Sequence, residues 1–137
     1  MGKRLSNKVA IITGAGSGIG RETSLLFLEE GAQVILADIN ATTLEETMNL
    51  VSQKGFKDNA VSVIADVSKE DAIEAMVKTA MDEFGHLDIL FNNAGLGGAF
   101  GSISDIDGDE WDQSMVILLK SVFMGIKHAS KVMKTNP

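Results

Sequence analysis

The stretch "KVAIITGAGSGIG", from Lys8 to Gly20, joins a short β-branched run to a cluster of glycines. The apolar run is typical of a buried strand, and the glycines are typical of a tight turn. The residues that follow, "RETSLLFLEEG", place apolar side chains at helical spacing and end at Gly31, a residue type common directly after a helix. A strand, a glycine turn and a helix in this order predict the first unit of a parallel α/β sheet.

The same alternation repeats along the chain. The later strand-like runs are continuously apolar, which is the pattern of strands buried on both faces. Right-handed crossovers then predict a three-layer, doubly wound parallel sheet of strand order 3-2-1-4, as one domain over residues 1–137 and incomplete after its fourth strand. The expected strands are 8–14, 32–39, 60–67 and 87–95, and the expected helices are 20–31, 41–55, 72–85 and about 107–133.

Several helix ends carry their own signals. Gly55 and Gly85 follow predicted helices as typical C-terminal residues. Ser68 and Asp71 form a Ser-x-x-Asp pattern, which predicts the N-terminal cap of the third helix. The acidic residues from Asp105 to Asp112 are expected to cap and favour the start of the last helix.

The composition limits the class of protein. The chain has 137 residues, no Cys and a formal net charge of −7. The negative charge argues against nucleic-acid binding, because no basic patch is available to neutralise phosphates. No apolar run approaches the roughly 18 residues that span a bilayer, and the lack of Cys fits a reducing compartment. We therefore expect a cytoplasmic globular protein with no nucleic-acid or membrane partner.

The glycine cluster predicts a phosphate-binding turn of Rossmann type. Its spacing is Thr-Gly-x-x-x-Gly-x-Gly, with Gly14 for the tight turn, Gly18 for close approach of a pyrophosphate and Gly20 for packing of the helix on the sheet. Ser17 and Ile19 complete the predicted contact, because the helix N-terminus offers unpaired N–H groups and a partial positive charge. The alternative is a tight turn with no ligand.

Asp38 ends the second predicted strand, 24 residues after Gly14. An acid about 20 residues after such a glycine is the residue type that binds the adenosine ribose hydroxyls of a dinucleotide. A carboxylate there repels a 2′-phosphate, so the pattern favours NAD over NADP, with Ile39 as its neighbour in the predicted site. The alternative is a solvated acid at a strand end.

These residues, taken together, resemble the short-chain dehydrogenase/reductase family. The matching elements occur in the family's order and spacing and cover essentially the whole chain. They are "TGAGSGIG" at 13–20, Asp38, "ADV" at 65–67, "NNAG" at 92–95 and the segment "W…LLKSVFMGIKHA" that begins at Trp111.

The resemblance implies an NAD(H)-dependent oxidoreductase that transfers hydride between nicotinamide and an alcohol or ketone. It also implies that Asp66 accepts from the adenine amino group, with the Val67 backbone beside it. Asn92, Ala94 and Gly95 resemble the segment that lines the ribose and nicotinamide side of the cofactor. A structural alternative for "NNAG" is a turn that pins the central sheet.

The chain departs from the family in two places. Leu118 occupies the position of a family Asn that takes part in catalysis, and leucine cannot hold a water or a carbonyl in a proton relay. The family's Ser and Tyr-x-x-x-Lys would lie beyond Pro137, so the chain is expected to be the cofactor-binding half of a longer dehydrogenase and to be inactive alone. A non-catalytic NAD-binding module and a fragment without independent function remain alternatives.

No catalytic or metal-binding residue is predicted within the chain. His86 and His128 have no partner at catalytic or metal-ligand spacing, and Lys120 and Lys127 are expected at solvent or at an interface. The last helix and the fourth strand expose apolar residues, which predicts a homo-oligomer, a dimer or tetramer packed through that helix. The residues concerned on the helix are Leu118, Leu119, Val122, Phe123 and Ile126.

Overall fold

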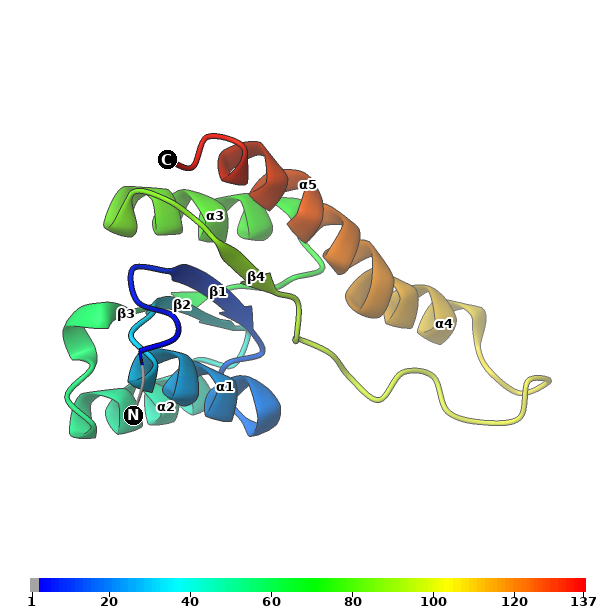
Figure 1. Cartoon of the computed structure of the whole chain (residues 1–137). Helices are drawn as coiled ribbons and strands as arrows, with labels where there is room; N and C mark the ends of the chain where they lie inside the picture. The colour runs from blue at the N-terminus through cyan, green and yellow to red at the C-terminus, as the bar shows by residue number, and fades with distance from the viewer. Residues whose placement is uncertain (1–2) are drawn as a thin grey trace.

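A computed structural model describes residues 3–137 and shows four parallel strands in one sheet (Figure 1). The strand order is β3-β2-β1-β4, which confirms the predicted 3-2-1-4 sheet. Ala10 of the central strand is paired with Val34 on one side and Ile89 on the other. The strands are β1 (Val9–Thr13), β2 (Gln33–Asp38), β3 (Ala60–Ile64) and β4 (Ile89–Phe91).

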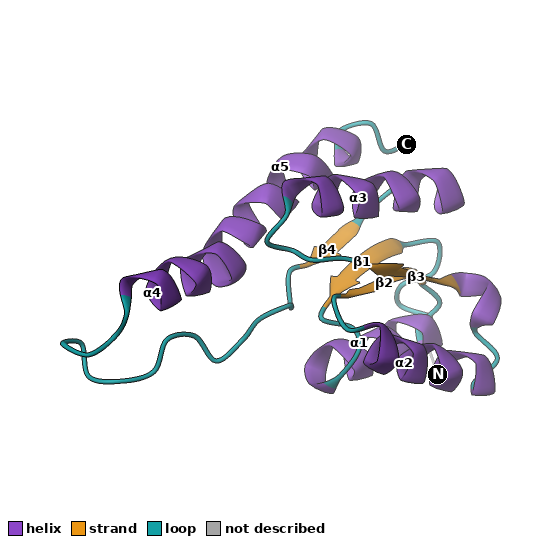
Figure 2. Ribbon diagram, turned by 180° about the vertical axis from the view of Figure 1, so that it is seen from behind, coloured by secondary structure: helices purple, strands orange, loops and turns teal. Residues whose placement is uncertain are grey.

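Helices cover both faces of the sheet, so the molecule has the three layers expected of a Rossmann-type fold (Figures 1 and 2). One face carries α1 (Gly18–Glu29) and α2 (Ala41–Gln53), and the other carries α3 (Glu70–Phe84) and α5 (Ser121–Met133). A short 3-10 turn, η1 (Lys57–Asn59), precedes β3. No helix among residues 3–137 is long and apolar enough to cross a membrane.

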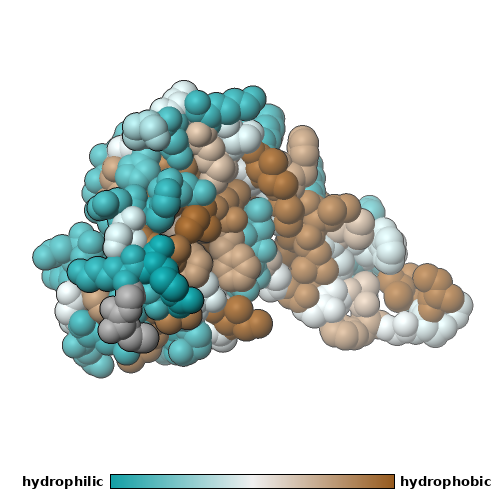
Figure 3. All heavy atoms as spheres, in the orientation of Figure 1, coloured by the Kyte–Doolittle hydropathy of each residue, from teal (hydrophilic) through white to brown (hydrophobic). Residues whose placement is uncertain are grey.

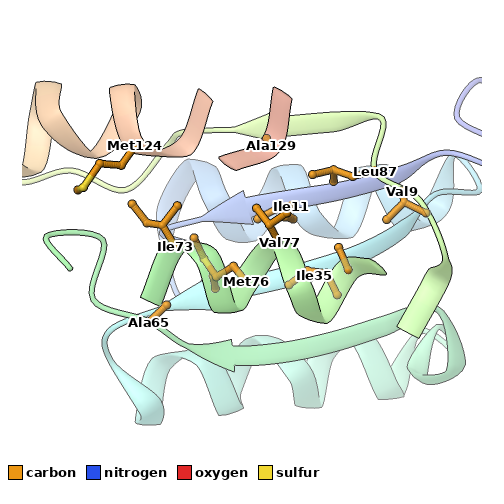
Figure 4. Packing of buried hydrophobic residues seen from close by; sticks show 12 residues of the cluster. Val9, Ile11, Ile35, Ala65, Ile73, Met76, Val77, Leu87, Met124 and Ala129 are labelled. Atoms are coloured by element: carbon orange, nitrogen blue, oxygen red, sulfur yellow. The ribbon is translucent and has the colours of Figure 1, made fainter. Parts of the chain in front are cut away.

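The core forms two apolar layers because side chains alternate along each strand. Ile11 and Ile35 pack in the layer under α3 and α5, which Figure 4 shows from close by. Ile12 and Leu36 pack in the opposite layer, under α1 and α2. All five residues of β1 are buried, so the strand is covered on both faces. Each fully buried aliphatic side chain contributes about 1.5–3 kcal/mol.

One local expectation is wrong. Ser68 does not cap the third helix: Lys69 is the N-cap residue, and no side chain caps this helix. The reason is that the backbone N–H of Ser68 donates to Oδ1 of Asp66 in a turn, and the helix begins at Glu70. The last helix runs without a break from Gly108 to Met133, close to its predicted bounds, and a π-helical turn, η2 (Val116–Lys120), lies within it between α4 (Gly108–Met115) and α5.

Other helix ends agree with the sequence. Gly31, Gly55 and Gly85 all have positive φ, the conformation that makes glycine favourable directly after a helix. Asp107 caps α4, since its Oδ1 accepts from the N–H of Asp109 at 2.7 Å. Between β4 and α4 the chain runs out as a long connection that extends away from the sheet (Figure 1).

Candidate functional site

The carboxyl ends of the strands meet at one edge of the sheet, where a cavity of about 200 Å³ opens. In open α/β sheets, ligands bind at this edge, next to the strand at which the order of the strands reverses. Here β1 is that strand, with β2 on one side and β4 on the other. The cavity is lined by Gly14, Ala37, Asp38, Ile39, Ala65, Asp66, Val67, Ala94, Gly95, Leu96 and Ile117.

The glycine turn brings β1 close to the segment after β4. Gly14 has a φ of +67°, and a β-carbon built on it would lie 3.0 Å from Cα of Ala94. Gly20 is buried, and a β-carbon there would overlap the carbonyl oxygen of Gly14. Both positions therefore need glycine for close backbone approach, as the motif predicts.

The N-terminus of α1 is open to solvent beside the cavity. Ser17 is the N-cap residue, but its side chain makes no capping hydrogen bond. Ser17, Gly18 and Ile19 are exposed, and their N–H groups meet no acceptor within residues 3–137. Gly18 has a φ of +52°, and a β-carbon on it would meet nothing within 4 Å. These uncapped amides, with the partial positive charge of the helix end, suit an anion.

Asp38 lies at the end of β2 and faces the glycine turn. Its Oδ2 accepts from the N–H of Gly16 at 2.8 Å, and its Oδ1 accepts from the N–H of Asn40 at 2.9 Å. A carboxylate has about four lone-pair sites, so further donors can still be accepted. Ile39, next in the chain, is 65% exposed at the rim of the cavity.

Asp66 follows β3 and lines the same cavity. Hydrogen bonds from the Ser68 hydroxyl and from the Ser68 backbone N–H hold the pKa of Asp66 below its usual value. The preceding residue, Ala65, donates its N–H to the carbonyl of Asp38 at 2.9 Å, which continues the pairing of β2 and β3 past the strand ends. The two acids, Asp38 and Asp66, therefore sit on neighbouring strand ends.

Thr13 and Asn93, which stand in the quoted motifs but are not among the predicted site residues, hold two segments of the site together. The buried hydroxyl of Thr13 accepts from the N–H of Asn93 at 3.0 Å and of Ala94 at 2.9 Å. The Asn93 side chain donates to the carbonyl of Thr13 at 3.0 Å. The two segments are thus clamped together, which positions Ala94 and Gly95 at the cavity. The signal in the sequence is the hydroxyl of Thr13 itself, because a polar side chain at the end of a buried strand needs a hydrogen-bond partner.

The remaining predicted residue, Asn92, turns away from the cavity lining toward α5. A β-carbon on Gly125 would lie 2.6 Å from Oδ1 of Asn92, so α5 approaches this side chain closely because it carries glycine there. Leu118, in η2, is 45% exposed and packs on the other side of the same segment. Its Cδ2 would lie 3.4 Å from a β-carbon on Gly95. The residue at this place is therefore apolar and offers no hydrogen bond.

The two histidines have structural contacts. Nε2 of His128 lies 2.8 Å from Oε1 of Glu70, linking α5 to the first turn of α3. Nε2 of His86 lies 3.1 Å from the carbonyl of Asn7, on a loop before β1. Within residues 3–137, no group of three His, Asp or Glu side chains is placed to hold a metal ion.

The fold and this glycine-lined edge define a dinucleotide-binding class of α/β protein. The chain belongs to the short chain dehydrogenase family, whose family model matches residues 8–137.

Individual relatives agree over nearly the whole chain. Short-chain dehydrogenase reductase ATA1 of Arabidopsis thaliana is 46% identical over 131 residues, which are 96% of this chain and 46% of the relative. Borneol dehydrogenase of Lavandula x intermedia is 41% identical over 135 residues, 98% of this chain and 49% of the relative. The crystal structure of an NAD⁺-bound xylitol dehydrogenase is similar with a TM-score of 0.89 at 36% identity, covering 96% and 50% of the two chains. The chain spans about half the length of the curated relatives it matches.

Proposed function

We propose that this chain is the NAD(H)-binding domain, residues 1–137, of an oxidoreductase that transfers hydride between nicotinamide and an alcohol or ketone. One observation carries the proposal: Gly14 and Asp38 line one cavity at the carboxyl edge of the sheet, and the turn that starts at Gly14 is tied to Asp38 and leads into the uncapped N-terminus of α1. The family, and the NAD⁺ held by the similar xylitol dehydrogenase, support the same assignment.

The lining residues fit the parts of the cofactor. The N–H groups of the 17–20 turn would bind the diphosphate, with Gly14 and Gly18 giving it room. Asp38 would accept from the adenosine ribose hydroxyls, beside Ile39. Asp66 and Val67 would hold the adenine, and Ala94 and Gly95 would form the wall on the nicotinamide side, with Asn92 behind them toward α5.

The charge of Asp38 supports NAD rather than NADP. A 2′-phosphate at the ribose would meet this carboxylate at close range, and the repulsion would not be offset. The turn residues Ala15, Gly16 and Ser17 carry no cationic side chain. Arg21, whose guanidinium contacts the turn at Gly16, is engaged with Glu46 at 2.9 Å.

The bound nicotinamide would supply or accept the hydride, while this chain binds and orients the cofactor. Proton transfer to the substrate oxygen needs a further group, and the chain contains no Tyr. Leu118, packed on the loop at Gly95, cannot relay a proton. We therefore propose that the chain alone does not turn over substrate. The apolar Leu118 also favours a second candidate, an NAD-binding module without catalysis.

An apolar surface on the last helices supports self-association, so we propose a homo-oligomer. Figure 3 shows apolar side chains gathered along these helices. Three of them, Met115, Leu119 and Phe123, line an open groove of about 560 Å³. Exposed apolar surface of this extent is typical of an interface. The exposed residues are Trp111, Met115, Leu119, Phe123 and Ile126.

Calorimetry tests the cofactor assignment directly. Titration of the folded chain with NAD and with NADH is expected to give saturable heat, with NADP binding more weakly. As a control, circular dichroism on the same sample would establish whether the chain is folded. Absence of heat with both NAD and NADH at millimolar concentration would overturn the proposal. Adding an alcohol with NAD is expected to give no absorbance at 340 nm, the signal of NADH.

A further inference from the structure

We propose that Arg21 is a positioning residue for the phosphate-binding turn, an inference that rests on the proposed NAD binding. Arg21 lies in the first turn of α1, and its side chain folds back over the turn that precedes the helix. It holds the carbonyl side of the turn against α2. The N–H groups of residues 17–20 are thereby left free for the proposed cofactor.

The guanidinium of Arg21, a residue of α1, links the glycine turn to α2. Nη2 donates to the carbonyl of Gly16 at 2.6 Å and to Oε2 of Glu46 at 2.9 Å. Nε donates to Oγ1 of Thr47 at 2.9 Å. Glu46 and Thr47 both belong to α2. The planar fork of an arginine suits this task, because its nitrogens hold several acceptors in fixed directions at once.

These contacts complete the hydrogen bonding of the two residues at the centre of the turn. Ala15 donates its N–H to the carbonyl of Ala37 at 3.0 Å and accepts at its own carbonyl from Thr47 Oγ1 at 3.0 Å. Gly16 donates to Asp38 and accepts from Arg21. All four backbone polar groups of Ala15 and Gly16 are therefore occupied by the protein.

Because the backbone groups of Ala15 and Gly16 are hydrogen-bonded within the protein, the free amides begin at Ser17. The Gly16 carbonyl accepts from Arg21, and the N–H of Gly20 forms no hydrogen bond with it. Ser17, Gly18 and Ile19 also have uncommitted N–H groups in residues 3–137. A site whose donors are already oriented binds its anion without the cost of ordering the loop. Arg21 supplies that order.

Arg21 is better placed to position the turn than to bind phosphate by charge. Its side chain is 23% exposed, and Glu46 balances its charge. Its Nε and Nη2 are committed to protein acceptors. A cation that acted by attraction to the diphosphate would have an effect that falls with salt concentration, whereas positioning by hydrogen bonds would not.

The experiment compares Arg21→Ala and Arg21→Lys with the unchanged chain by NAD calorimetry at low and high salt. Lysine keeps the charge but cannot hold Gly16 and Thr47 with two nitrogens. Both variants are expected to weaken NAD about tenfold or more, with unchanged salt dependence. Wild-type affinity in Arg21→Lys, or a flatter salt dependence in Arg21→Ala, would assign a charge role and overturn the inference.

Lys54→Ala is the matched control, because Lys54, directly after α2, forms an ion pair of 2.8 Å with Glu29 at the far end of α1 from the turn. It is expected to leave NAD affinity unchanged.

A second measurement needs no cofactor. Hydrogen exchange of the Gly16 amide, followed by NMR, is expected to speed up in the Arg21 variants and to stay unchanged in Lys54→Ala. Unchanged exchange in the Arg21 variants would overturn the inference. If the unchanged chain failed to bind NAD, the proposed function would be wrong. The hydrogen exchange of the Gly16 amide would still test the positioning role of Arg21. Should Arg21→Ala not fold, Arg21→Lys serves for both measurements.

Discussion

The N–H of Gly16 donates a hydrogen bond of 2.8 Å to Oδ2 of Asp38, so the turn after β1 is tied to the end of β2. A β-carbon on Gly16 would lie 2.8 Å from the same oxygen, which shows how closely the two segments approach. The acid proposed to bind the ribose therefore also shapes the turn proposed to bind the diphosphate. The two halves of the cofactor site are coupled through this bond.

Replacing Asp38 with Ala is expected to weaken NAD binding roughly 10- to 100-fold, because hydrogen bonds to a charged acceptor are each worth about 1.5–3 kcal/mol. NADP binding is expected to change less or to improve, since the repulsion of its 2′-phosphate is removed. Calorimetry with both cofactors gives the ratio. Asp58→Ala removes an exposed acid elsewhere and should change neither affinity. A preserved preference for NAD in Asp38→Ala would remove Asp38 from this role.

Gly20→Ala is expected to destabilise the fold by about 1–3 kcal/mol, because the added carbon overlaps the carbonyl oxygen of Gly14 and forces α1 away from the turn. Urea unfolding measures the loss. Gly108→Ala is the control: a β-carbon there meets nothing within 4 Å, and φ is not positive. That control should be neutral or slightly stabilising. Equal stability of the two variants would show that the close approach of Gly20 is not needed.

The sequence predicted the fold because its signals are local. Apolar runs such as Val9–Thr13 and glycines such as Gly85 depend on near neighbours in the chain, and the strand order followed from the alternation of elements. Position along the chain also identified residues that the structure brings together at one cavity, among them Asp38 and Asp66. Their binding roles stay predictions.

The contacts that hold the site together could not be predicted in this way. Thr13 and Ala94 are 81 positions apart, and Thr47 and Ala15 are 32 apart, so the local sequence pattern does not predict either contact. The strand at Ile89–Phe91 is shorter than predicted for the same reason, because Thr13 takes the next amides out of the ladder. The π-helical turn at Val116–Lys120 had no signal such as a proline or glycine.

Glu70 joins α3 to α5 by accepting from Lys127 and His128, and these hydrogen bonds lower its pKa from 4.5 to about 2. A lowered folded-state pKa means that the stabilisation is complete above pH 4.5 and is lost as the pH falls toward 2. Glu70→Gln is therefore expected to lower the melting temperature at pH 7, with a difference that disappears between pH 4.5 and 2. Calorimetric melts across this range measure it.

Asp82→Asn is the control for that series, because Asp82 forms an exposed ion pair with Lys78 within α3 alone. Such pairs contribute little. A difference between Glu70→Gln and the unchanged chain that persisted at pH 2 would contradict the assignment.

Phe123→Glu tests the proposed self-association. Phe123 is 61% exposed and lines the groove on the apolar surface of the last helices. A charge buried there without a partner is strongly unfavourable, so the sedimenting mass is expected to fall to that of one chain, 14.6 kDa. Leu26→Glu changes an apolar residue of α1 that is 42% exposed, and it should leave the assembly intact. An unchanged sedimenting mass in Phe123→Glu would place the interface elsewhere.

Thr13→Val keeps the shape of the side chain and removes its hydroxyl, which leaves the N–H of Ala94 without an acceptor and the N–H of Asn93 with the carbonyl of Phe91 alone. Each partly buried amide that loses its partner costs about 1–3 kcal/mol. Thr13→Ser retains the hydroxyl and should restore most of the stability in urea unfolding. Because the clamp sets the wall formed by Ala94 and Gly95, NAD affinity is expected to follow the same order. If valine and serine were equally stable, the clamp would have no energetic role, and the wall would be held by the Asn93 side chain instead.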